Sequence, residues 1–81
     1  MKTEYTDAIL QEMKEMKEND YYFYNANDEE YFHVHTDYKN NPTYMKKKEC
    51  SNRIEIISKD EFEKFVSSSY TTKTSDFQYY G

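Results

Sequence analysis

The sequence predicts a small α+β domain in which two helices cover one face of a four-stranded antiparallel sheet. Two segments, one in each half of the chain, repeat apolar residues at helical spacing. Four segments between them are rich in Tyr, Phe, Ile and Val and are separated by clusters of Asn, Asp and Ser, as strands and turns are. The predicted order is α-β-β-β-β-α, with residues 1–69 as one domain and residues 70–81 as a flexible or docking tail.

The first helix is predicted from Thr6 to about Lys17, with Thr3 or Thr6 as its N-cap. Its inward face is expected to hold four apolar residues at spacings of four, four and three: Tyr5, Ile9, Met13 and Met16. Its outer face is expected to present four carboxylates to solvent: Glu4, Glu12, Glu15 and Glu18. The helix is therefore amphipathic, with an acidic outer surface.

The predicted strands follow, and a short helix closes the domain. The strands fall within residues 21–25, 30–37, 43–49 and 53–57, with the first two forming a hairpin. Ser58 and Glu61 have the spacing of a capping box, so the second helix is expected to begin near Lys59. The basic run Lys46–Lys48 is interpreted as a solvated strand edge, where lysines discourage pairing with another chain.

The scarcity of glycine and cysteine excludes several classes of function. The only glycine is Gly81, so no glycine-rich loop exists to hold a nucleotide phosphate, and turns depend on Asn, Asp and Ser instead. The single Cys50 cannot form an intramolecular disulfide, and no apolar run is long enough for a signal sequence or a membrane span. We therefore expect a non-secreted, cytoplasmic protein without membrane contact.

One alternating triplet has metal-binding residue types. His33, His35 and Asp37 would point to the same side of a strand, as the ligands of some metal sites do. Alternation in any strand produces such triplets, so two histidines on a hydrated sheet face is the preferred interpretation. No arrangement of a nucleophile with a base, or of paired carboxylates in a cleft, indicates catalysis. We expect no enzyme activity, no cofactor and no metal.

Negative charge is concentrated in the N-terminal part of the chain. Residues 1–37 hold ten acidic residues against three lysines, a net charge of −7, whereas residues 38–81 hold eight basic residues against six acidic ones, a net charge of +2. Phosphates would be repelled from most of such a surface, which argues against direct nucleic-acid binding. Ten tyrosines accompany these charges, and tyrosine is enriched at protein interfaces. The combination favours an acidic, aromatic surface that binds a basic protein.

In composition the chain resembles small bacteriophage-encoded proteins that bind and inhibit host machinery, including the DNA mimics, whose carboxylates stand in for phosphates. It shares with them a short, acidic, glycine-poor and tyrosine-rich chain with a bias toward Lys, Asn and Glu. The resemblance implies an inhibitor or modulator of a basic host protein, such as a nucleic-acid-binding one, and it assigns no residue roles.

The expected binding surface combines aromatic anchors with acidic steering groups. The predicted anchors are Tyr21, Tyr22, Tyr24 and Tyr31. The predicted steering charges are Glu15, Glu18, Asp20, Asp28, Glu29 and Glu30. The alternative hypothesis is a structural or regulatory subunit whose aromatic face is used in a homodimer, because the chain has few aliphatic residues for its own core.

Overall fold

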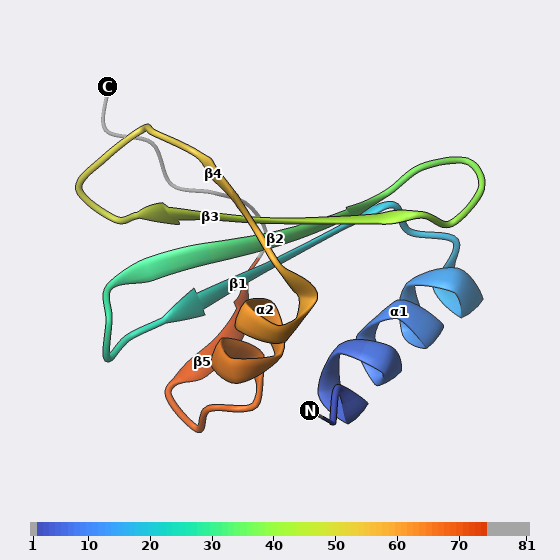
Figure 1. The fold of residues 1–81 in the computed structure, drawn as a ribbon, viewed down its shortest axis with the longest axis horizontal. Coiled ribbons are helices and arrows are strands. Elements are labelled where there is room, and N and C mark those ends of the chain that lie inside the picture. The colour runs from blue at the N-terminus through green and yellow to red at the C-terminus, as the bar shows by residue number, and fades with distance from the viewer. Residues whose placement is uncertain (1, 75–81) are drawn as a thin grey trace.

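The computed structural model describes residues 2–74, which form a small α+β domain with two helices and one five-stranded antiparallel sheet. The elements in chain order are α1 (Glu4–Met16), β1 (Asp20–Asn25), β2 (Glu30–Thr36), β3 (Pro42–Lys48), β4 (Glu55–Ile57), α2 (Lys59–Val66) and β5 (Thr71–Thr74). Both helices lie on the same side of the sheet (Figure 1). Neither helix within residues 2–74 has the length and apolar character needed to cross a bilayer.

The sheet has one strand more than the sequence analysis predicts. Its strands lie in the order β4-β3-β2-β1-β5, and β5 pairs with the outer edge of β1. Three of the four residues of β5 are threonines, which favour extended backbone, and the edge of β1 offers unpaired backbone groups. The fully buried Asn25 fixes the junction, because its Nδ2 donates to Thr71 Oγ1 over 2.8 Å. Residues 75–81 of the predicted tail lie outside the described residues.

The core lies between the helices and one face of the sheet, here called the helix-covered face. Phe23 pairs with Phe32 across β1 and β2, and the ring of Phe62 from α2 packs edge-on against Phe23 at 5.9 Å. The buried cluster takes residues from both helices and three strands: Met13, Tyr21, Phe23, Phe32, Val34, Tyr44 and Phe62. Aromatic rings thus supply most of the apolar area that the few aliphatic residues cannot.

The predicted helix α1 is confirmed, but its buried face is rotated from the predicted one. Met13 is buried as expected, whereas Tyr5 and Met16 are 52% and 64% exposed. Thr6 is fully buried instead, and its backbone N–H donates to the carboxylate of Glu63 in α2 over 2.7 Å. This bond satisfies one of the free N–H groups in the first turn and places negative charge at the positive end of the helix dipole.

The start of α2 is confirmed at Lys59, with Ser58 as its N-cap. The Ser58 hydroxyl accepts a hydrogen bond from the backbone N–H of Glu61 over 3.1 Å, which is the N-cap bond of the predicted capping box. The Nζ of Lys59 also lies 2.7 Å from the Asp7 carboxylate of α1. An exposed ion pair and a buried hydrogen bond therefore join the two helices.

The turns use left-handed backbone at residues that are mostly not asparagine. Positive φ angles occur at Lys17 after α1, at Glu29 before β2 and at Asn40 before β3. Asparagine tolerates this conformation through its short polar side chain, but lysine and glutamate carry the full steric cost of a Cβ atom. Of the residue types on which the turns are expected to depend, only asparagine, at Asn40, takes a positive φ among the described residues.

Candidate functional site

The candidate site lies on the face of the sheet opposite α1 and α2, here called the helix-free face. Strand register places on this face every second residue of β1, β2 and β3, with Ile56 from β4. Its members from the first three strands are Asp20, Tyr22, Tyr24, Tyr31, His33, His35, Thr43, Met45 and Lys47. The face is therefore aromatic and polar, in contrast with the phenylalanine-rich core on the other side.

Two cross-strand ring pairs form the centre of the helix-free face. The Tyr22 ring stacks on His33 with centroids 4.2 Å apart and an interplanar angle of 19°. In the next pair along the hairpin, the Tyr24 ring lies tilted against the Tyr31 ring, with centroids 4.7 Å apart. Cross-strand aromatic pairs stabilise a sheet and hold each ring in one orientation. Tyr22 and Tyr24 remain half-buried, so their rings are fixed and still partly accessible.

A buried lysine adjoins the second ring pair. Lys47 is only 1% exposed, and its Nζ lies 5.0 Å from the centroid of the Tyr31 ring. The same Nζ donates to the carbonyls of Lys48 and Ser51 at 3.3 and 2.9 Å. The interpretation of Lys46–Lys48 as a solvated edge is therefore wrong for Lys47, because the turn after β3 folds back over this side chain. It is also wrong for Lys46, which pairs with Glu55 of β4 inside the sheet and whose Nζ lies 2.9 Å from the Glu61 carboxylate.

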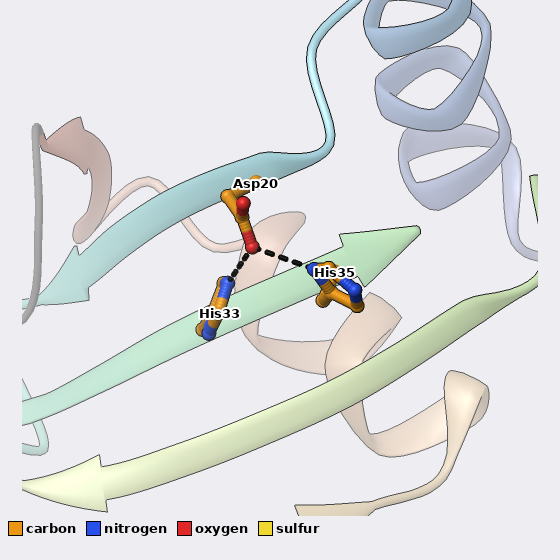
Figure 2. Close-up of side chains that lie close together, drawn as sticks. All are labelled: Asp20, His33 and His35. Atoms are coloured by element: carbon orange, nitrogen blue, oxygen red, sulfur yellow. Dashed lines mark hydrogen bonds and ion pairs between the residues drawn. The ribbon is translucent and has the colours of Figure 1, made fainter. Parts of the chain in front are cut away.

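A three-residue cluster occupies the opposite end of the face (Figure 2). Asp20 begins β1 and lies across from His35 of β2. One carboxylate oxygen, Asp20 Oδ1, lies 2.8 Å from His33 Nε2 and 2.8 Å from His35 Nδ1. The predicted partner Asp37 does not join them, since β2 ends at Thr36 and the Asp37 carboxylate accepts backbone N–H bonds in the following turn.

The electrostatics of Asp20 follow from these two contacts. Partial burial alone would raise the pKa of its carboxyl group, but hydrogen bonds from His35 and then His33 outweigh burial and lower that pKa. Asp20 is therefore an ionised carboxylate at neutral pH. It is 41% exposed and His35 is 46% exposed, whereas His33 is 13% exposed, so the cluster opens to solvent on one side.

Three of the four predicted tyrosine anchors lie on the helix-free face. Tyr22 and Tyr24 are half-buried there, and Tyr31 is 6% exposed beneath its neighbours. The fourth, Tyr21, belongs to the core, because adjacent strand residues point to opposite faces. Its hydroxyl donates to Glu12 over 2.8 Å, and this bond, with burial, raises the pKa of Tyr21 to about 12.

Five of the six predicted steering charges are exposed, and they lie at both ends of the β1–β2 hairpin. Glu15, Glu18 and Asp20 are near its start, and Asp28 and Glu29 are in its turn. The two groups are separated by β1, whose six residues span roughly 17 Å.

The sixth predicted charge, Glu30, is 6% exposed on the helix-covered face, beside Lys46 at 3.9 Å. Its alternation with Tyr31 puts it on the wrong side of β2 for the proposed surface.

Comparisons with protein-family models, with curated proteins and with solved structures gave no match to this chain. The interpretation of the site therefore depends on its own geometry.

Proposed function

We propose that this protein is a small acidic protein-binding module that inhibits or modulates a partner by occupying the partner's basic, nucleic-acid-binding surface. The supporting observation is that Tyr22 and Tyr24, half-buried on the helix-free face, lie between two groups of exposed carboxylates at the two ends of the hairpin. Hot spots at protein interfaces are commonly rings surrounded by polar groups, and this hairpin has that arrangement.

The rigidity of the rings favours binding. Stacking on His33 holds Tyr22, and contact with Tyr31 together with a hydrogen bond to Glu49 at 3.2 Å holds Tyr24. A side chain that is already ordered loses little conformational entropy when a partner covers it. Tyr22 and Tyr24 can therefore contribute contact area at small entropic cost.

The charges determine which partner fits. Carboxylates at both ends of the hairpin attract a surface that is basic over a similar length, as a nucleic-acid-binding groove is. In such a groove they would take the place of backbone phosphates, which is DNA mimicry. Direct nucleic-acid binding by the same face is disfavoured, because it would bring phosphates against carboxylates.

The first experiment identifies the partner and tests whether this protein competes with the partner's nucleic acid for the same surface. The protein is used to capture ligands from a bacterial lysate, and each captured basic protein is then tested for binding to its own nucleic acid. We expect increasing amounts of the acidic module to displace the nucleic acid from the captured protein. Formation of a ternary complex without displacement would contradict occupation of the nucleic-acid surface.

The second experiment tests the steering charges. Neutralising the hairpin turn with Asp28→Asn and Glu29→Gln should slow association and reduce its salt dependence. The matched control, Glu4→Gln with Asp60→Asn, removes the same net charge from the first turns of α1 and α2 on the other side of the sheet. Equal association rates for the two double variants would contradict the proposal.

A second candidate function is self-association, favoured by apolar residues on the β4 edge. Ile54 is 44% exposed and Ile56 is 77% exposed, and β4 is the last strand on its side of the sheet. A dimer that covers these residues would be nearly insensitive to salt, unlike the proposed complex with a basic partner, whose association is steered by opposite charges. Sedimentation at micromolar concentration separates the two, since Ile56→Gln should abolish a dimer formed there and, because it adds no positive charge to the helix-free face, leave the complex with a basic partner intact.

A further inference from the structure

The Asp20, His33 and His35 side chains form the only group of three or more potential metal ligands found within residues 2–74. Each offers one ligand atom, and the three atoms lie within 4.8 Å of one another. They come from two directly paired strands, so the backbone that carries them is rigid. The geometry points to a binding site for a divalent transition-metal ion, of the zinc class, at the start of the β1–β2 hairpin.

The ligand types select this class of ion. Two imidazole nitrogens and one carboxylate oxygen suit zinc and its neighbours in the first transition row, whereas calcium and magnesium prefer oxygen ligands alone. The ion would replace the two N–H protons that face the Asp20 carboxylate, because each neutral imidazole can shift its proton to the other ring nitrogen and a charged one releases a proton to solvent. The carboxylate supplies negative charge where the cation would sit. The inference needs no protein partner and does not rest on the proposed function.

The distances require only small adjustments. Tetrahedral metal–ligand bonds of about 2.0–2.2 Å place two ligand atoms roughly 3.3–3.6 Å apart, so each histidine–aspartate pair needs to open by less than about 1 Å from 2.8 Å. All three ligand atoms lie within 4.8 Å of one another, so the two imidazole nitrogens need to approach by no more than about 1.5 Å. Rotation of His35, the most exposed side chain of the three, can supply this movement. His33 is held by its stack on Tyr22 and provides the fixed ligand.

The exposure of the cluster leaves room for a fourth ligand. Asp20 and His35 are each more than two-fifths exposed on the helix-free face, so a water molecule or a side chain from another molecule can approach the ion. Three protein ligands with one open position is a common zinc arrangement. The ion would also link β1 to β2 by side chains, at the end of the hairpin opposite its turn.

The test uses Zn²⁺ alone on the full chain, with Cys50→Ser as the background because Cys50 is exposed and a thiolate also binds zinc. Calorimetry should show saturation at one equivalent of metal. The chain has two histidines, so the ring proton signals of both are resolvable by NMR, and both should shift during the titration. Absence of saturable binding, or a shift of only one histidine, would overturn the inference.

Matched variants locate the site. Asp20→Asn and His35→Gln each remove one ligand and should weaken zinc binding at least about tenfold. Asp28→Asn removes the same charge as Asp20→Asn from the other end of the hairpin and should leave affinity unchanged. Circular dichroism checks folding, and the exposed His35 provides a second variant if Asp20→Asn unfolds. Equal affinities for Asp20→Asn and Asp28→Asn would overturn the assignment.

Discussion

The two faces of the sheet both depend on aromatic rings, but they hold those rings in different ways. On the helix-covered face, Phe32 is fully buried and stacks on Phe65 of α2 at 4.5 Å. On the helix-free face, Tyr22 and Tyr24 pack against rings of the neighbouring strand and remain half-buried. The rings of the first set stabilise the folded state by burying apolar area, and the rings of the second set keep exposed area that a partner can cover. The strand register decides toward which face each ring points, so it determines the role of a ring together with its residue type.

The largest expected effect comes from the buried ring of α2. Phe62→Ala leaves a cavity beneath Phe23 and Tyr44 and should lower the free energy of unfolding by about 3–5 kcal/mol. Tyr22→Ala on the other face removes one cross-strand pair and should cost about 1 kcal/mol or less. Urea denaturation of both variants measures the difference. Similar costs would mean that the helix-free face is part of the core.

The next effect concerns the polar contact that joins the two covering helices. Glu63→Ala removes the acceptor of the Thr6 N–H and leaves that donor buried, at a cost of about 1–3 kcal/mol. Glu63→Gln keeps an acceptor but loses the charge at the N-terminus of α1, so it should cost less. Denaturation that ranks Gln as worse than Ala would contradict this explanation.

A buried hydroxyl on the helix-covered face predicts that one substitution will increase the stability of the fold. Tyr44 Oη is buried and has no hydrogen-bond partner among the described residues, so Tyr44→Phe removes an unsatisfied polar atom. We expect a stabilisation of about 1 kcal/mol, measured by thermal unfolding. The comparison variant is Tyr21→Phe, which loses the bond to Glu12 and should destabilise by a similar amount. A loss of stability in Tyr44→Phe would show that its hydroxyl has a partner.

The smallest effect is electrostatic and depends on pH. Hydrogen bonding to Lys59 holds the pKa of Asp7 below its ordinary value of 3.8, against the opposing effect of burial. A depressed pKa stabilises the folded state above 3.8, and the stabilisation is lost as pH falls through the folded-state value. Asp7→Asn should therefore be slightly less stable than the parent at pH 6, and the difference should shrink as the pH falls through the folded-state pKa of Asp7. A difference that is constant with pH would exclude the ion pair as its cause.

Much of the fold follows from local sequence patterns. Helical spacing predicts α1, and the Ser58 and Glu61 capping box predicts the start of α2 at the right residue. Turn-forming residues separate the first four strands correctly. Strand β5 is missed because residues 71–74 contain no apolar side chain, and their pairing depends on the free edge of β1 and on Asn25. That edge exists only once the sheet has formed.

The candidate site is predicted less completely, because it depends on strand register. Alternation within β1 separates Tyr21 from Tyr22, but the sequence does not say which of them points toward the helices. The His33 and His35 pair is visible in the sequence, whereas its carboxylate partner is Asp20, across the hairpin, and not the nearby Asp37. Pairing the two strands through their turn in the sequence, with Asn25 opposite Glu30, would have found this contact.

The most direct test of the central claim is the footprint of the captured partner on this protein. Amide and side-chain NMR signals are recorded with and without the partner, and the residues that change are mapped onto the two faces. We predict changes at Tyr22, Tyr24, Asp28 and Glu29, with little change at the exposed surface of α2. A footprint centred on α1 and α2, with Tyr22 and Tyr24 unchanged, would contradict the assignment of binding to the helix-free face.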